Sequence, residues 1–200
     1  MGIAVGPSYP IRTERLELRP FEPEDFDALL DIYSRPEVAT YLYEGARGED
    51  EVRELLRKKV AARALVKAGD ALSLAAILAS TGDLIGDVLG VWTSAEHRQG
   101  EVGYVVHPDH QGNGYATEAV EPVLALLFGD LGLHRVIGRL EARNAASARV
   151  LEKLGMRREA HLVENEWVKN EWQSEVVYAI LDREWAARLS SAEASETSTR

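Results

Sequence analysis

Apolar and polar residues alternate along the chain with two different periods, and these periods predict its secondary structure. Short runs rich in β-branched and aromatic residues, bounded by Gly, Pro, Asn or Asp, are typical of strands. Such runs lie at residues 11–20, 71–79, 84–92, 101–107, 134–141, 157–168 and 172–181. Apolar residues at helical spacing predict helices within residues 22–33, 49–66, 116–128 and 144–154. The mixture of both patterns indicates an α/β protein.

The order of these segments indicates how a sheet is built from them. Thr81-Gly82-Asp83 separates two strand-like runs and is a hairpin signal. Residues 134–141 follow a helix, so we expect them to lie parallel to the strand that starts at Glu101, because a crossover helix connects parallel neighbours. Ser94 to Gly100 form a polar turn before the Glu101 strand, which gives an antiparallel meander, and we expect a mostly antiparallel sheet flanked by helices.

The length and apolar content limit the number of domains. Two hundred residues with 46% apolar content are enough to bury one good core. We therefore expect an N-terminal extension at residues 1–10 and a single domain at residues 11–185. Residues 186–200 are poor in apolar residues and rich in Ser, Glu and Ala, which predicts a disordered C-terminal tail.

The stretch from Glu101 to Phe128 joins a strand to a helix through the sequence Gln111-Gly112-Asn113-Gly114-Tyr115-Ala116. Two glycines at such a junction allow a tight turn and the close approach of a ligand. The amides of the turn point together toward the positive end of the helix, which creates a site for an anion. Taken alone, the glycine pair is equally compatible with an ordinary strand-to-helix loop.

The composition excludes several classes of function. The formal net charge is -10 and the acidic residues are spread along the chain, which argues against a nucleic-acid-binding protein. The acidic balance is compatible with a cationic substrate or with solubility alone. Cysteine is absent, which excludes disulfides, thiolate metal sites and an acyl-cysteine intermediate. The five histidines are scattered, so we predict no metal site.

The start of the chain has neither the basic residues nor the apolar run of a secretory signal. No segment approaches the roughly 18 consecutive apolar residues of a membrane-spanning helix. We therefore expect a cytoplasmic protein that does not bind membranes.

Two motifs resemble the signatures of the GNAT N-acetyltransferase superfamily. Gln111, Gly114 and Ala116 occupy the positions of its acetyl-CoA motif, and NAASARVLEKLGM, from Asn144 to Met156, resembles its second signature. The resemblance implies a single domain with a centrally splayed sheet and acetyl-CoA as co-substrate. It also implies contacts with acetyl-CoA from residues of the strand, the loop and the second motif: Val105, Val106, Gln111, Gly112, Asn113, Gly114, Tyr115, Ala116, Thr117, Asn144 and Ser147.

The two ends of the domain resemble the RimJ/RimL branch of this superfamily. The opening TERLELRPFEPED and RPEVATYL carry the resemblance, as do Trp172, Tyr178 and Glu184-Trp185 near the end. Gln173-Ser174 stand where that branch often has His-Asp, which weakens any detailed inference about the substrate.

The family resemblance also points to the acceptor pocket. In the family, the loop between the first helices helps to wall this pocket, so Tyr41, Tyr43 and Glu44 are candidates for substrate binding. The same residues are equally compatible with an exposed mobile loop.

Amide formation from a thioester needs a deprotonated amine, a polarised carbonyl and a stabilised thiolate. By resemblance, a backbone amide near Val105-Val106 polarises the carbonyl, and Glu101 is the candidate general base or an exposed strand residue. Many family members protonate the thiolate with a helix tyrosine, but that position is Leu151 here. Ser147, one turn earlier, is the candidate donor instead, with Tyr178 as the weaker alternative.

These features predict the transfer of an acetyl group from acetyl-CoA to a primary amine by direct attack. The first candidate acceptor is the α-amine at a protein or peptide N-terminus, and the second is a small polyamine or aminoglycoside. A catalytically silent acyl-CoA sensor is the alternative from another class. A nucleotide binder of the Rossmann type is disfavoured, because the third glycine of its motif is absent. A homodimer is compatible with the resemblance, since family members often pair.

Overall fold

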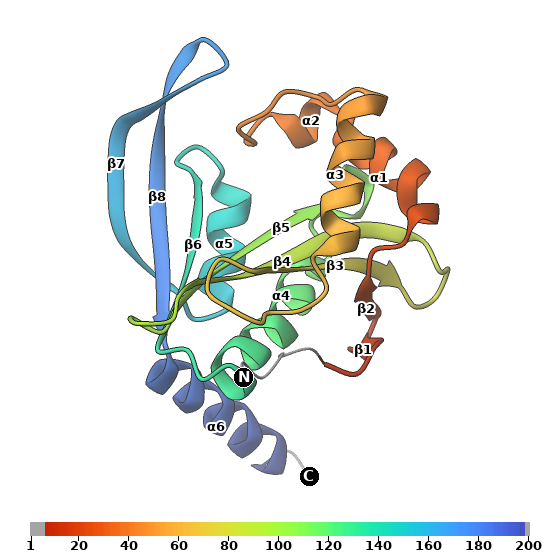
Figure 1. The fold of residues 1–200 in the computed structure, drawn as a ribbon. Coiled ribbons are helices and arrows are strands. Elements are labelled where there is room, and N and C mark those ends of the chain that lie inside the picture. Colours follow the sequence, from red (N-terminus) through yellow and green to blue (C-terminus); the bar gives the residue numbers. More distant parts are fainter. Residues whose placement is uncertain (1–6, 199–200) are drawn as a thin grey trace.

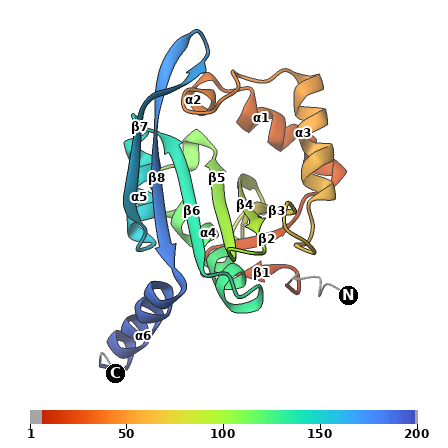
Figure 2. The same cartoon turned by 60° about the vertical axis from the view of Figure 1, so that its left-hand side comes forward.

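The computed structural model describes residues 7–198, which form one eight-stranded sheet with helices on both faces (Figures 1 and 2). The strands are β1 (Ile11–Arg12), β2 (Leu16–Pro20), β3 (Ala71–Leu78), β4 (Leu84–Ser94), β5 (Gln99–Val106), β6 (Arg135–Glu141), β7 (Arg157–Val168) and β8 (Glu171–Leu181). The α-helices are α1 (Phe26–Tyr33), α2 (Pro36–Ala39), α3 (Glu49–Ala61), α4 (Tyr115–Ala125), α5 (Ala145–Lys153) and α6 (Asp182–Ser198). Shorter helical turns are η1 (Pro23–Asp25), η2 (Pro108–His110) and η3 (Leu126–Asp130).

The strand order is β1-β2-β3-β4-β5-β6-β8-β7, and β5 with β6 is the one parallel pair among these neighbours. The predicted mostly antiparallel sheet is therefore confirmed. Helix α4 makes the crossover between the two parallel strands, as expected for such a connection.

The sheet opens between β5 and β6. These strands pair only from Gln99 with Arg135 to Glu101 with Ile137. Beyond that point, β5 continues to Val106 beside β4 alone, and β6 continues to Glu141 beside β8 alone. The resulting gap in the middle of the sheet confirms the predicted central splay.

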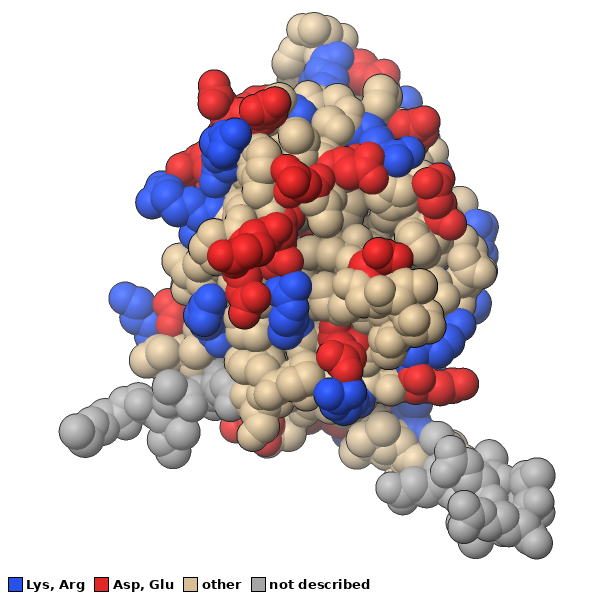
Figure 3. Space-filling model, turned by 90° about the vertical axis from the view of Figure 1, so that its right-hand side faces the viewer, with Lys and Arg blue, Asp and Glu red and all other residues tan. Residues whose placement is uncertain are grey.

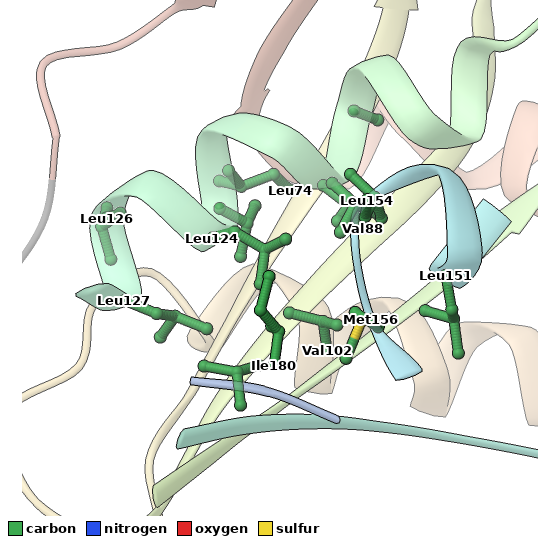
Figure 4. Packing of buried hydrophobic residues seen from close by; sticks show 14 of the residues in the cluster. Leu74, Val88, Val102, Leu124, Leu126, Leu127, Leu151, Leu154, Met156 and Ile180 are labelled. Atoms are coloured by element: carbon green, nitrogen blue, oxygen red, sulfur yellow. The ribbon is translucent and has the colours of Figure 1, made fainter. Parts of the chain in front are cut away.

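Two hydrophobic cores lie on opposite faces of the sheet. On one face, α4 and α5 pack over residues such as Leu74, Val88 and Val102 (Figure 4). On the other face, α1 and α3 cover Ala75 and Ile77 of β3. Because β3 is buried on both faces, its sequence is an apolar run interrupted only by Ser73 rather than an alternating one.

The hairpin predicted at Thr81-Gly82-Asp83 is present, and a second one joins β7 to β8. Leu78 and Asp83 close the first one through a backbone hydrogen bond of 2.8 Å, with φ 82° at Gly82. The second turn, between β7 and β8, has φ 51° at Lys169 and 63° at Asn170. Two adjacent positive φ values match the twist of antiparallel strands, which explains this sharp reversal.

Three predicted elements differ from the structure. The strand expected at residues 11–20 is broken into β1 and β2, because Thr13 Oγ1 accepts a hydrogen bond from the Leu16 amide and turns the chain. The helix expected at 49–66 ends at Ala61, since Leu65 leaves it to join the core on the other face. The segment expected as a tail from residue 186 continues α6 as far as Ser198, because Ala, Arg and Glu favour helix.

Charged residues of both signs are interspersed on the face seen in Figure 3. Along α3, for example, Arg53 pairs with Glu49 and Arg57 pairs with Glu54, at spacings of four and three residues. Such pairs keep the outer face of a helix solvated. Within residues 7–198, no helix is both long and apolar enough to cross a membrane.

Candidate active site

The turn between β5 and α4 depends on two glycines in the left-handed region. Gly112 has φ 80° and Gly114 has φ 86°, conformations that residues with a Cβ adopt only with strain. Gly114 is also the N-cap of α4, so the helix begins directly at the turn. The backbone of the turn is thus set by the glycine spacing.

Two side chains of the turn hold its own backbone. Gln111 Nε2 donates to the Val106 carbonyl at 2.9 Å, which ties the turn to the end of β5. Asn113 Nδ2 donates to the carbonyls of His110 and Gln111 at 3.2 and 3.1 Å. These amide side chains therefore shape the turn.

The first turn of α4 offers donors without partners. The first hydrogen bond of the helix runs from the Glu118 amide to the Gly114 carbonyl, so the helix gives the amides of residues 115–117 no acceptor. Thr117 Oγ1 is buried and has no hydrogen-bond partner within the described part of the chain. An anionic oxygen at this helix end would satisfy these groups.

Residues of the β1–β2 turn form hydrogen bonds that hold the glycine turn and the start of α4. The Glu118 carboxylate accepts hydrogen bonds from Thr13 Oγ1 at 2.6 Å and from the Arg15 amide and Nε at 2.7 and 2.8 Å. Burial acts to raise the pKa of Glu118, but these hydrogen bonds outweigh it and lower the pKa. Arg15 also donates to the Asn113 carbonyl at 3.0 Å and stacks on the Tyr115 ring, 4.6 Å from its centroid.

A cavity of about 330 Å³ extends from this turn into the gap between β5 and β6. Most of the residues expected to contact acetyl-CoA line it, and Asn113 is the exception. Those residues are Val105, Val106, Gln111, Gly112, Gly114, Tyr115, Ala116, Thr117, Asn144 and Ser147. His110, Arg149 and Lys153 add basic groups to the wall.

Two hydroxyl groups meet at the inner part of this cavity. Tyr104 Oη lies 2.8 Å from Ser147 Oγ and donates to the Ser147 carbonyl at 2.9 Å. Asn144 is the N-cap of α5, and its Oδ1 accepts from the Ser147 amide at 3.0 Å. Tyr104 belongs to the part of β5 that lies beyond its last pair with β6. The hydrogen bonds therefore join β5 to α5.

Position 151 and Tyr178, the other places considered for a proton donor to the thiolate, bring no hydroxyl to the cavity. Leu151 is 1% exposed and packs so closely on β6 that a Cβ on Gly138 would lie 2.8 Å from its Cδ1. Tyr178 donates to Glu152 Oε1 at 3.0 Å and does not line the cavity. Of the predicted donor candidates, Ser147 therefore lines the cavity, where it meets Tyr104.

A second cavity, of about 120 Å³, lies beside the first one and is acidic. Its walls come from the loop after α2 and from β6, β7 and β8: Tyr41, Leu42, Tyr43, Arg139, Leu140, Glu141, Glu166, Gln173, Ser174 and Glu175. Three carboxylates and one guanidinium are among them. Glu175 is only 5% exposed and has no cationic partner within 4.0 Å in the described residues.

Glu101 lies at the last β5–β6 pair, beneath the opening of the gap. Its carboxylate is 3.4 Å from Arg139 Nε and is not part of either cavity wall. Burial raises the pKa of Glu101, while Arg139 opposes the shift and Glu175 adds to it. A carboxylate with a raised pKa beside an acidic cavity is suited to accepting a proton.

The three residues proposed for the acceptor pocket have different surroundings. Tyr41 lines both cavities, and Tyr43 lines the second one, where its hydroxyl donates to Glu175 Oε2 at 3.1 Å. Burial, a hydrogen bond with Glu166 and the charge of Glu175 raise the pKa of Tyr43. Glu44 lines neither cavity and pairs with Arg47 at 3.2 Å.

The β7–β8 hairpin closes over this loop. Lys169, at the tip of the hairpin, donates from Nζ to the carbonyls of Ala39 and Thr40 at 2.7 and 2.9 Å. Residues of the second half of the chain thereby hold the segment that carries Tyr41 and Tyr43 against the second cavity.

The sequence analysis did not find the residues that give the second cavity its charge, nor Tyr104. Glu141, Glu166 and Glu175 come from three strands and have no common motif in the sequence. The spacing of Tyr104 from the glycine turn offered a signal, since it lies in the strand that leads to it. Its partnership with Ser147 spans 43 positions and depends on the fold.

Comparisons with known proteins agree with this architecture. Residues 15–157 match the model of the acetyltransferase (GNAT) domain family. The chain is 35% identical over 175 residues to the uncharacterized N-acetyltransferase YnaD of Bacillus subtilis, covering 88% of this chain and 98% of the relative. It is 26% identical to a spermidine N(1)-acetyltransferase of Vibrio cholerae, covering 80% of this chain and 88% of the relative.

Among solved structures, an acetyltransferase (GNAT family) from Bacillus anthracis superposes with a TM-score of 0.78 at 34% identity, covering 86% of this chain and 98% of that one. The splayed sheet, the glycine turn at the start of α4 and these matches lead to one assignment. The chain belongs to the acetyltransferase (GNAT) domain family and is an N-acetyltransferase.

Proposed function

We propose that the protein transfers the acetyl group of acetyl-CoA directly to a primary amine held in the second, acidic cavity. The observation that carries this proposal is the gap between β5 and β6. One side of the gap holds a cavity that runs from an anion-accepting helix end to Ser147, and the other side borders an acidic cavity.

The first cavity fits acetyl-CoA. The pyrophosphate would accept hydrogen bonds from the amides of residues 115–117 and from Thr117 Oγ1, which has no other partner in the described residues. Arg149 and Lys153 would neutralise further phosphate charge at the cavity wall, and His110 lines the same wall. The pantetheine arm would follow Val105 and Val106 toward the gap.

Within this arrangement, each chemical requirement has a candidate group. Glu101, alone or through a water, would take the proton of the attacking amine, for which its raised pKa is suited. A backbone amide of β5 near Val105 would polarise the thioester carbonyl. Ser147 Oγ would donate to the sulfur as the carbon–sulfur bond breaks.

The acidic cavity favours an acceptor with more than one positive charge. Glu141, Glu166 and Glu175 lie in its wall with Arg139, and although Arg143 pairs with Glu141 at 3.0 Å, Glu166 and Glu175 have no salt bridge within the described residues. Opposite charge concentrates a cationic substrate and orients it in a partly buried site. The geometry thus supports a small polyamine or aminoglycoside as the first acceptor, as for the spermidine relative. The α-amine of a protein or peptide, as in the RimJ/RimL branch, becomes the second.

An assay of thiol release from acetyl-CoA tests this proposal. The amine panel contains spermidine, an aminoglycoside, free lysine, and peptides with Ser, Ala and Met N-termini. We expect the highest kcat/KM with spermidine or the aminoglycoside, and a loss of about tenfold or more in Glu175→Gln, because a charged hydrogen-bonded contact is removed. Glu44→Gln is the matched control, since Glu44 lines neither cavity.

Other outcomes would change the proposal in defined ways. Preference for a peptide would restore the α-amine as the acceptor. Tight binding of acetyl-CoA without turnover on any amine would favour a silent acyl-CoA sensor instead.

A further inference from the structure

We propose that Tyr104 supplies, from strand β5, the hydroxyl that helix α5 lacks, and that it positions Ser147 at the leaving sulfur. The inference rests on the proposed function, because it concerns the thiolate that leaves in the same acyl transfer. It assigns a role to a residue whose position in the gap is visible only in the folded chain.

The contacts between the two residues are close and join β5 to α5. Tyr104 Oη lies 2.8 Å from Ser147 Oγ and 2.9 Å from the Ser147 carbonyl oxygen. Both residues line the first cavity. Ser147 cannot move away freely, because the Asn144 cap and the first turn of α5 hold its backbone.

Position 151, where many GNAT enzymes have a tyrosine, is a buried leucine in this chain. Leu151 is buried against Gly138 of β6, where even a Cβ would come within 2.8 Å of its Cδ1. The alkyl side chain at position 151 has no proton to donate to a leaving thiolate. Tyr104 instead brings a hydroxyl from β5 to Ser147, in the first turn of α5.

The protonation state of Tyr104 suits a fixed donor. Burial raises the pKa of Tyr104 to about 12, although the hydrogen bond with Ser147 opposes the shift. The phenol therefore keeps its proton at neutral pH. Tyr104 donates its single proton to the Ser147 carbonyl, which fixes the first turn of α5, and its oxygen accepts from Ser147 Oγ until the sulfur offers the serine proton a second acceptor.

The step balances without a further reactant. The amine nitrogen bonds to the acetyl carbon and the carbon–sulfur bond breaks, while the amine proton passes to Glu101. The thiolate leaves with a hydrogen bond from Ser147 Oγ, while the Ser147 carbonyl accepts from Tyr104, and the thiolate takes a proton from water on release. Glu101 returns its proton to water, so neither hydroxyl loses its proton overall.

Kinetics of Tyr104→Phe test this assignment, with Ser147→Ala and the double variant measured beside it. The ring remains, so the strand packing is kept, and circular dichroism with thermal melting checks the fold. We expect kcat to fall about tenfold in Tyr104→Phe with KM for acetyl-CoA changed less than about twofold. The double variant should be little worse than Ser147→Ala, because the two hydroxyls act as a unit.

Tyr178→Phe is the matched control. It also removes a tyrosine hydroxyl from a strand beneath α5, but that hydroxyl contacts Glu152 outside the cavity. We expect its kcat to stay within about twofold of the wild type.

A selenium analogue of acetyl-CoA separates a chemical role from a structural one. A selenolate is a weaker base than a thiolate and needs less stabilisation as it leaves, so the defect of Tyr104→Phe should shrink with this donor. A defect of equal size with both donors would overturn the inference, as would an unchanged kcat in Tyr104→Phe. If the wild type releases thiol and one of these two results is found, only this inference is overturned. If the wild type releases no thiol with any amine, the proposed function is overturned as well.

Discussion

Thr117 carries the least satisfied side chain of the site. Its hydroxyl oxygen is buried in the first turn of α4 and lacks a hydrogen-bond partner in the described residues. An unsatisfied buried hydroxyl destabilises a fold, whereas an apolar group of the same shape does not. A residue that lowers stability at a helix N-terminus is understandable if a ligand completes its hydrogen bonds.

Replacement of this hydroxyl should therefore separate stability from binding. We expect Thr117→Val to raise KM for acetyl-CoA about three- to tenfold and to leave the unfolding free energy equal or higher. Thr117→Ser keeps the hydroxyl and should keep KM. Steady-state kinetics and denaturant unfolding measure the two effects, and a lower stability with unchanged KM would contradict the role.

Glu101 gives a prediction about pH. A general base must be ionised, so kcat/KM should fall as the pH drops through the pKa of Glu101, which burial has raised. Arg139 lowers that pKa, so removing its charge in Arg139→Leu should raise it further and move the acid limb of the profile to higher pH. Glu101→Gln should abolish the limb. Identical profiles in the wild type and in Arg139→Leu would rule out Glu101 as the base.

Among the elements, the β1–β2 turn has a role that its length does not suggest. It is short and lies at the start of the described chain, yet Arg15 and Thr13 together hold Glu118 of α4, more than 100 positions away. The pair Arg15–Glu118 also borders the turn that carries both positive-φ glycines. The first strands therefore support the helix end at which the anion site lies.

Loss of this support should weaken acetyl-CoA binding without slowing the chemical step. We expect Arg15→Met to raise KM for acetyl-CoA about three- to tenfold, with kcat within about twofold, because the loop loses these hydrogen bonds while Glu101 and Ser147 stay in place. Arg12→Met is the control, since Arg12 pairs with Glu17 on the same hairpin and does not reach the loop. A fall in kcat at constant KM would contradict this role.

At the scale of the whole molecule, a buried cluster of three polar residues joins helices α1 and α3 to the sheet. Asp87 of β4 accepts from Lys59 Nζ of α3 and from Tyr33 Oη of α1, each at 2.8 Å. All three residues are less than 9% exposed. Helices α1 and α3, which lie before and after the loop that carries Tyr41 and Tyr43, are thereby tied to one point of the sheet.

Breaking this cluster should destabilise the whole fold. We expect Asp87→Asn to lower the unfolding free energy by about 3 kcal/mol, because Lys59 keeps a buried charge without its partner. Glu54→Gln removes one partner of an exposed pair on the same helix and should leave stability unchanged. Urea unfolding measures both variants, and equal stabilities would show that water reaches Lys59.

Much of the fold follows from local patterns in the sequence. The hairpin at Gly82 and the crossover between β5 and β6 are present as predicted, and Asn144 caps α5 through its own side chain. One failure shows where local patterns stop deciding the fold. At residues 62–66 helical periodicity continued, but burial of Leu65 in the opposite core was worth more than another helical turn.

The features of the site also separate into those set by local sequence and those set by tertiary contacts. The sequence by itself determined the glycine turn, the helix that starts from it and the asparagine cap, because backbone conformation at glycines and helix ends is a local property. Only the tertiary structure decided that Tyr104 would meet Ser147, that Arg15 would hold Glu118, and that three separate glutamates would form one acidic cavity. Those contacts join distant segments, and they arise when the splayed sheet brings its strands and helices together.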